Sequence, residues 1–166
     1  MTTATKPLKR DKSLVPLSRE HHFGLLFCWK LKQGMANGTS LEIMRQYIQY
    51  FWKNVLKAHC REEEIILKRL LPKDDVMSAR LHEEHQLLQA IIGLINKQKN
   101  LNTSLVATLQ QDLTDHIRWE ERELFPYLQT MADPEELADV GRLLEHDLKP
   151  PVDDFAPAFW ENRKVA

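Results

Sequence analysis

The chain has 166 residues, with 23 Lys and Arg against 24 Asp and Glu, a formal charge of −1 and 43% hydrophobic residues. These values are typical of one ordinary domain with a single core, and the balanced charge gives no reason to expect nucleic acid or an anionic membrane as a partner. The longest apolar run is far shorter than a bilayer crossing requires, and the N-terminus lacks the apolar block of a signal peptide. We therefore expect a cytoplasmic protein. Two Cys are too few for a disulfide framework.

Helical patterns follow one another along the chain. Residues 1–13 are polar and without periodicity, so we expect a flexible N-terminal arm. Thr39, with Glu42 three residues later, is predicted to cap the second helix, Thr103 the fourth and Asp133 the fifth. The predicted helices cover about residues 18–33, 39–71, 75–97, 103–130 and 134–146.

Strand signals are nearly absent, because no segment sustains an alternation of apolar and polar residues. The sequence therefore predicts an all-α fold, in which four long helices form an up-down-up-down bundle over residues 14–148 and the fifth, short helix follows. The tail over residues 149–166 is rich in Pro but also carries Phe155, Phe159 and Trp160. We expect it either to fold back on the bundle or to cover a protein partner or a second copy of the chain, and the sequence does not choose between these.

Two of the predicted helices carry a His and a Glu four residues apart on a stripe that is otherwise apolar. His59 and Glu63 lie on the second helix, and His116 and Glu120 lie on the fourth. Residues i and i+4 share one face of a helix, so each pair is predicted to point into the core. Glu64 shares its face with basic residues, which predicts that it faces solvent.

The first and third helices add further His. His85 lies on the apolar stripe of the third helix, whereas His82 lies on its polar face. On the first helix we predict that His22 points inward, because the apolar residues three, four and seven positions after it share its face. His21 has apolar neighbours of its own and stays an alternative. His82 and His146 are predicted to be surface residues, although either could supply an extra ligand.

Buried carboxylates require an explanation, because an uncompensated charge in a core costs several kcal/mol. Each Glu could be held by its own His without a metal, which would make the chain a metal-free helical interaction module. That interpretation must be invoked twice and still leaves two inward His unexplained, so a metal site explains the pattern better. Six ligands without thiolate exceed the needs of one tetrahedral zinc, which favours two ions, and iron, manganese and zinc all suit imidazole and carboxylate. The predicted ligands are His22, His59, Glu63, His85, His116 and Glu120.

This pattern resembles the hemerythrin-like HHE cation-binding domain. The resemblance covers about residues 15–130, repeats as two halves that each hold a lone His followed by HxxxE, and includes the strings SREHHFGL, HCREEEIIL, EEHQLL and HIRWEERELFPYL. It implies a four-helix bundle around a non-haem centre of two iron ions, with the two Glu bridging the ions and the His in terminal positions. The resemblance thus selects iron among the metals that the residue types allow.

The sequence departs from the oxygen-carrying hemerythrins. Those carry a second His one turn from the lone His of the third helix, where this chain has Leu81 and Gln89, and they end with HxxxxD, where His116 is followed by Glu120. The pattern is closer to the bacterial and regulatory branch, which is linked to O2 or NO sensing, iron handling and repair of iron–sulfur centres. We expect a protein that binds or senses O2, NO or a redox state, more a sensor than a catalyst. The alternatives are iron donation for iron–sulfur repair, or a redox enzyme.

Overall fold

The computed structural model describes residues 8–161, and every regular element in that range is helical. The predicted all-α class is confirmed. In chain order the elements are α1 (Val15–Ala36), α2 (Leu41–Phe51), η1 (Trp52–Leu56), α3 (Lys57–Leu70), α4 (Val76–Lys97), α5 (Thr103–Trp119), η2 (Glu120–Leu124), α6 (Phe125–Met131) and α7 (Pro134–Asp147).

Two of the long helices contain a π-helical turn. The turn η1 joins α2 to α3 without a break, and η2 joins α5 to α6 in the same way. The predicted second and fourth helices therefore exist as continuous helices. A π turn holds one residue more than an α turn, so it changes which residues face inward beyond it. In the fourth helix, for example, Leu128 is buried after η2, whereas Tyr127, which an uninterrupted α-helix would bury, is only half-buried.

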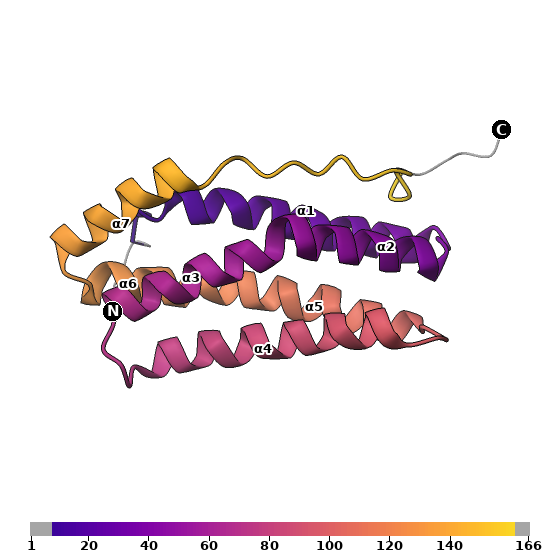
Figure 1. Cartoon of the computed structure of the whole chain (residues 1–166), viewed down its shortest axis with the longest axis horizontal. Helices are drawn as coiled ribbons and strands as arrows, with labels where there is room; N and C mark the ends of the chain where they lie inside the picture. Colours follow the sequence, from indigo (N-terminus) through magenta and orange to yellow (C-terminus); the bar gives the residue numbers. More distant parts are fainter. Residues whose placement is uncertain (1–7, 162–166) are drawn as a thin grey trace, which may run out of the picture.

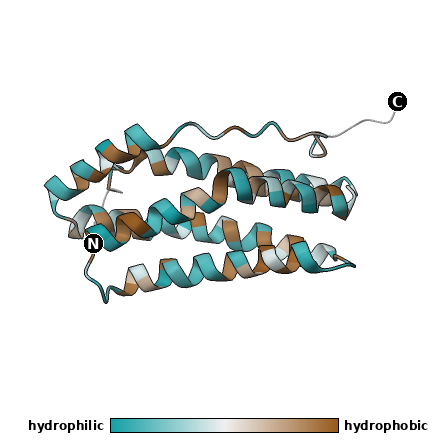
Figure 2. Ribbon diagram, in the orientation of Figure 1, coloured by the Kyte–Doolittle hydropathy of each residue, from teal (hydrophilic) through white to brown (hydrophobic). Residues whose placement is uncertain are grey.

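The long helices lie side by side along one axis (Figure 1). Helix α4 contacts α5 on one side and α2 and α3 on the other, while α1 contacts α2, α3 and α5. Hydrophobic residues alternate with hydrophilic ones along each of these helices (Figure 2), as expected for helices that bury one stripe. No helix in residues 8–161 combines the length and apolar composition needed to cross a membrane.

The helix caps agree with the sequence in part. Asp133 accepts hydrogen bonds from the backbone N–H of Glu135 and Glu136, so the predicted cap of α7 is confirmed. The cap of α5 is Asn102, not Thr103, because the Asn side chain accepts a bond from Leu105 N–H. Residue 40 and not residue 39 precedes α2, and no side chain caps that helix, so the predicted capping box is wrong.

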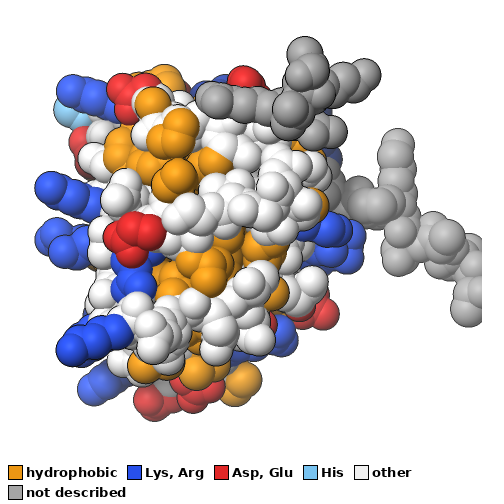
Figure 3. Space-filling view, turned by 90° about the vertical axis from the view of Figure 1, so that its right-hand side faces the viewer, with side chains coloured by type: hydrophobic (Ala, Val, Ile, Leu, Met, Phe, Trp, Pro, Cys, Tyr) orange, Lys and Arg blue, Asp and Glu red, His pale blue; other side chains and the backbone are white. Residues whose placement is uncertain are grey.

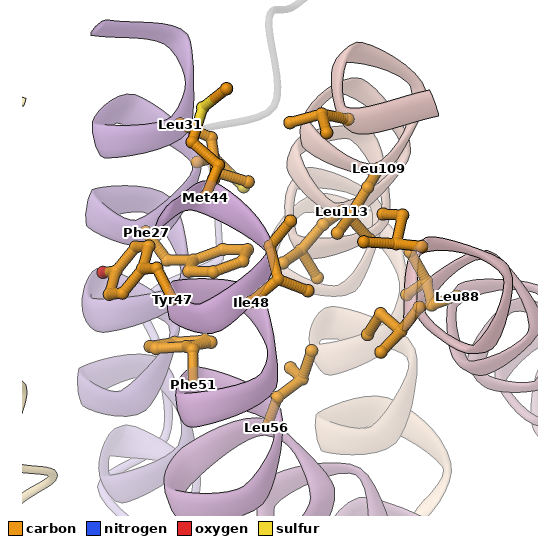
Figure 4. Packing of buried hydrophobic residues seen from close by; sticks show 14 of the residues in the cluster. Phe27, Leu31, Met44, Tyr47, Ile48, Phe51, Leu56, Leu88, Leu109 and Leu113 are labelled. Atoms are coloured by element: carbon orange, nitrogen blue, oxygen red, sulfur yellow. The ribbon is translucent and has the colours of Figure 1, made fainter. Parts of the chain in front are cut away.

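The hydrophobic core is divided into two clusters. One fills the space between α1, α2, α4 and α5, where Phe27, Tyr47, Phe51 and Leu113 pack with their neighbours (Figure 4). The other lies towards α6 and α7 and includes Leu17 and residues of α3, α4, η2, α6 and α7. The buried His and Glu side chains of the long helices belong to neither cluster, and they make up the candidate site described below.

The ends of the described chain contact the helices. Residues 1–7 of the predicted flexible arm lie outside the described residues, but Arg10 contacts the bundle, because its guanidinium donates hydrogen bonds to Gln129 and Glu121. The C-terminal strap, residues 150–161, runs from α7 along α1 and α2 (Figure 1). The tail thus folds back on its own chain. That it also contacts a partner or a second copy stays a prediction.

An ion pair and an aromatic contact fix the strap. Lys30 is buried and pairs with Asp153 at 3.1 Å, and its ammonium group lies 3.9 Å from the ring centroid of Trp160. The ring of Phe159 packs against Gly34, where a Cβ atom would come within 2.8 Å of it. Figure 3 views the molecule from the end where the strap finishes, and apolar side chains gather in the middle of that face.

Substitution of Gly34 is expected to displace the strap. Gly34→Val should push Phe159 off α1, at a cost of about 1–3 kcal/mol for overpacking, and thereby change the fluorescence of the neighbouring Trp160 and expose the strap to protease. Gly93→Val is the matched control, since a Cβ there meets nothing within 4 Å. Equal rates of strap cleavage in the two variants would show that the contact does not hold the strap.

Candidate metal centre

The long helices bring four His and two Glu side chains together in the interior. His21 comes from α1, His59 and Glu63 from α3, His85 from α4, His116 from α5 and Glu120 from η2. All six are at least 94% buried, and the two Glu are completely buried. Five of these residues are among those singled out from the sequence, and the structure places them next to one another.

The Nε2 atoms of the His face the two carboxylates. His21 Nε2 lies 3.1 Å from Glu63 Oε1 and 3.2 Å from Glu120 Oε2, which makes it the link between the two Glu. His59 Nε2 is 2.7 Å from Glu63 Oε1, His85 Nε2 is 3.2 Å from Glu63 Oε2, and His116 contacts Glu120. Ligand atoms about 2.1 Å from a common ion lie about 3.0–3.4 Å apart, so these separations are compatible with a shared ion as well as with direct His–Glu ion pairs.

Several of these buried atoms lack a hydrogen-bond partner. Among the described residues, Glu63 Oε2, His85 Nε2, His116 Nε2 and both carboxylate oxygens of Glu120 are buried and unsatisfied, although they lie close together. An unsatisfied buried polar group costs about 1–3 kcal/mol, and more when it is charged. A cation between them would satisfy all of these atoms at once. The residues present therefore fit a metal site.

The ligand atoms fall into two groups of four that share both Glu. One group is His21, His59, Glu63 and Glu120, and the other is His85, His116, Glu63 and Glu120; within each group, the ligand atoms lie within 4.8 Å of one another. The His of the first group come from the first half of the chain, and the His of the second group come from the second half. Each half of the chain thus supplies the two His of one group and one of the two Glu that both groups share.

His22 does not point into the bundle, and this corrects the sequence prediction. It is exposed and lines a surface groove with Phe23, while His21 occupies the inward position. The apolar residues that favoured His22 are themselves partly exposed, since Leu25 is 37% and Trp29 48% accessible. His82 and His146 lie at the surface as predicted, where they contact Glu64 and Asp147 respectively.

Each of the four buried His also contacts a second carboxylate through its other ring nitrogen. His21 Nδ1 lies 2.7 Å from Glu121 Oε1 and His59 Nδ1 lies 3.0 Å from Glu20 Oε2. In the other half, His85 Nδ1 is 3.3 Å from Glu64 Oε1 and His116 Nδ1 is 3.1 Å from Glu84 Oε1. We refer to Glu20, Glu64, Glu84 and Glu121 as the outer carboxylates.

Sequence reasoning missed the outer carboxylates and assigned Glu64 to solvent. The signal was nevertheless present. Glu20 directly precedes His21 just as Glu84 directly precedes His85, while Glu64 and Glu121 directly follow the Glu of each HxxxE motif. The repeated unit is therefore Glu-His followed by HxxxEE, and its alignment selects His21 over His22.

The family comparison agrees with this geometry. The family model described as Hemerythrin HHE cation binding domain matches residues 17–128. The chain belongs to the hemerythrin HHE cation-binding family. Neither a search of curated proteins nor one of solved structures finds a match. The matched range contains the six inward residues and the four outer carboxylates, and it ends before α7 and the strap.

The charges in this hemerythrin-family site depend on one another. Burial alone would lower the pKa of His59, but the charge of Glu63 and the hydrogen bonds that protonated His59 donates to Glu20 and Glu63 raise it to about 9. Burial also opposes protonation of His116, yet Glu120 and Glu84 raise its pKa to about 10. Burial would raise the pKa of Glu63, but His59 and His21 hold it well below its ordinary range. Without metal, protons on the His therefore compensate the buried carboxylates.

The metal-free protein is expected to lose stability as the pH rises from 7 to 10. The pKa values of His59 and His116 are above the ordinary value of 6.5 in the folded state, so their contribution is complete below about pH 6.5 and is lost as the pH passes 9 and 10. The urea concentration at the unfolding midpoint, measured between pH 7 and 10 in the presence of a chelator, reports this loss of stability. The variant Glu63→Leu/Glu120→Leu controls for other titrating groups, and an equal pH dependence in both proteins would contradict the assignment.

A small cavity adjoins the site of this hemerythrin-family domain. Its free volume is about 10 Å³, the space of about one water-sized sphere. Apolar side chains make up one side of it, and His21, His59, His116 and Glu120 make up the other. A Cβ atom on Gly24, which lines the cavity, would lie 2.7 Å from Ile117 Cδ1. The cavity thus has room for a very small ligand beside the ligand atoms.

Proposed function

We propose that this chain holds two iron ions in the interior of an up-down-up-down four-helix bundle and uses them to bind or sense O2, NO or a redox state. The observation that carries the proposal is the set of buried, unsatisfied ligand atoms, which divides into two groups that share Glu63 and Glu120. Iron is the metal that the hemerythrin-like pattern implies, and imidazole with carboxylate suits it.

In this proposal His21 and His59 would hold one ion and His85 and His116 the other, and Glu63 and Glu120, which belong to both groups, would be available to both ions. Bound iron would supply redox-active centres with coordination positions that the protein does not fill. The side chains around the site would control the access of water and of ligands. The apolar walls around the small cavity limit water, and its volume of about one water-sized sphere excludes substrates larger than a diatomic molecule.

The cavity favours gas binding over an enzymatic role. A substrate larger than a diatomic molecule would have to displace packed side chains such as Phe51 and Leu113, which line this side of the site. Iron donation remains the second candidate, because the outer carboxylates Glu64 and Glu121 are partly exposed and connect the site to solvent. It predicts that iron leaves the protein when an acceptor is added.

The test is metal analysis of protein purified without oxygen, together with absorption spectra before and after exposure to air and NO. About two irons per chain and new charge-transfer bands are expected for the wild type. His21→Ala should lose metal, whereas His22→Ala, one residue away and exposed, should keep it. Zinc alone, or no metal in a folded wild-type chain, would overturn the proposal.

A further inference from the structure

We propose that the outer carboxylates are positioning residues that fix the four imidazoles and shift the metal pair towards its higher oxidation state. The proposal rests on the proposed function, because it requires two metal ions at the inner residues. It begins from the contacts at Nδ1, which are separate from the Nε2 contacts that define the metal groups.

The outer carboxylates link the helices in a closed ring. Each one lies on a different helix from the His that it contacts. Glu20 of α1 contacts His59 of α3, and Glu64 of α3 contacts His85 of α4. Glu84 of α4 contacts His116 of α5, and Glu121 of η2 contacts His21 of α1, which closes the ring. A neutral imidazole that binds metal through Nε2 carries its proton on Nδ1, and a carboxylate there accepts that proton in a hydrogen bond. The ring therefore selects the tautomer and the rotation of all four His.

The same contacts place negative charge one imidazole away from each ligand atom. A carboxylate on Nδ1–H makes the imidazole a stronger electron donor, which favours an ion of higher charge. The two inner and four outer carboxylates are six negatively charged groups, and even with Arg10 and Arg80 paired to two of them they surround the site with negative charge that favours the more highly charged ions. Removal of one outer charge should therefore destabilise the oxidised pair relative to the reduced pair.

The four positions differ in how much of their charge is offset by other groups. Arg10 pairs with Glu121, and Arg80 pairs with Glu84. Glu64 contacts His82, which is half exposed. Among the described residues, the Glu20 carboxylate has His59 as its one hydrogen-bond and ion-pair partner, and its side chain is 10% accessible, the lowest value of the four. Loss of the charge at Glu20 should therefore have the largest effect.

Two substitutions at Glu20 separate orientation from charge. Glu20→Gln keeps an oxygen that can accept the Nδ1 proton but removes the charge, whereas Glu20→Leu removes both. Glu20→Leu should weaken Zn²⁺ binding to the metal-free protein by about 10-fold to 100-fold, the usual cost of losing such a partner, and Glu20→Gln should restore most of that affinity. Glu83→Gln, on the exposed side of α4, is the control.

The charge effect is read from the reduction potential of the iron-loaded protein, followed by its absorption spectrum. In Glu20→Gln the ratio of oxidised to reduced protein at a fixed potential should fall by at least about tenfold, or about 59 mV for a one-electron step. Glu64→Gln should shift it in the same direction by less. A wild type that binds neither Zn²⁺ nor iron refutes the proposed function and this proposal with it. Normal metal binding with an unchanged Zn²⁺ affinity in Glu20→Leu, or an unchanged potential in Glu20→Gln, refutes this proposal alone.

Discussion

Replacement of both inner carboxylates, Glu63→Leu with Glu120→Leu, is expected to abolish metal binding and yet make the metal-free protein more stable. Both side chains are completely buried, and their charges must be compensated by protonated His. Without the two Glu the four His can stay neutral, each with its Nδ1–H donated to an outer carboxylate, so no buried charge is left uncompensated and the gain approaches the value of about 1–4 kcal/mol seen when a buried ion pair is replaced by apolar residues. Metal content and urea unfolding in the presence of a chelator measure the two effects.

A loss of metal binding together with a gain in the stability of the metal-free protein distinguishes a metal-binding site from a set of structural ion pairs. The matched control is Glu123→Leu, since Glu123 lies in the same π turn as Glu120 but its side chain is 62% accessible. That variant should keep about two ions per chain. If the double variant still held two ions, the bridging role of the Glu would be wrong; if it were much less stable without metal, the His–Glu pairs would be structural.

Gly24→Val is expected to weaken NO binding by at least about tenfold, equivalent to about 1.4 kcal/mol, while both metal ions stay bound. The added side chain must occupy space that is now shared by Ile117 and the small cavity, because even a Cβ atom lies 2.7 Å from Ile117 Cδ1. Gly24 itself offers no ligand atom, so the metal groups are unaffected. An NO titration followed by absorption, with metal analysis of the same sample, gives both quantities.

A variant with the opposite effect completes this test. Ile117→Ala enlarges the cavity and should admit ligands larger than a diatomic molecule, such as azide. Gly93→Val, where the new side chain meets nothing within 4 Å, controls for the general effect of Val in a helix. Unchanged NO affinity in Gly24→Val would show that gas reaches the metal from another side.

The sequence predicted most of the site, because helical spacing is a local property. The HxxxE pairs place His59 with Glu63 and His116 with Glu120 on one face whatever the rest of the chain does. Helical spacing alone does not decide between the two adjacent His on α1, because each of them shares its face with some apolar residues. Only the packing of α1 on α5 and α7 decides which of those residues are buried, and it buries those on the side of His21.

Long-range contacts explain the other misses. Glu64 lies beside basic residues on its own helix, but it reaches His85 on the next helix, and the pattern of one helix does not show this contact. The π turn η1 also depends on tertiary structure, because no residue in Trp52–Leu56 is a Gly or Pro, whereas η2 has a local cause in Pro126, which lacks the N–H that would bond the carbonyl of Arg122. The strap direction likewise depends on the Lys30–Asp153 contact between distant segments.

The polar layer that separates the two apolar clusters has a consequence for cooperativity. Without metal, each cluster is a hydrophobic unit of its own, joined to the other through helices that carry ionic groups. Such units can open separately, so amide hydrogen exchange in the metal-free chain should be faster at the end that contains α6 and α7 than at the end that the strap covers. Ions that bind residues from all the long helices would join the two units, and the loaded protein would then unfold in a single transition. Bound metal would thus determine the cooperativity of unfolding as well as the ligands that the protein binds.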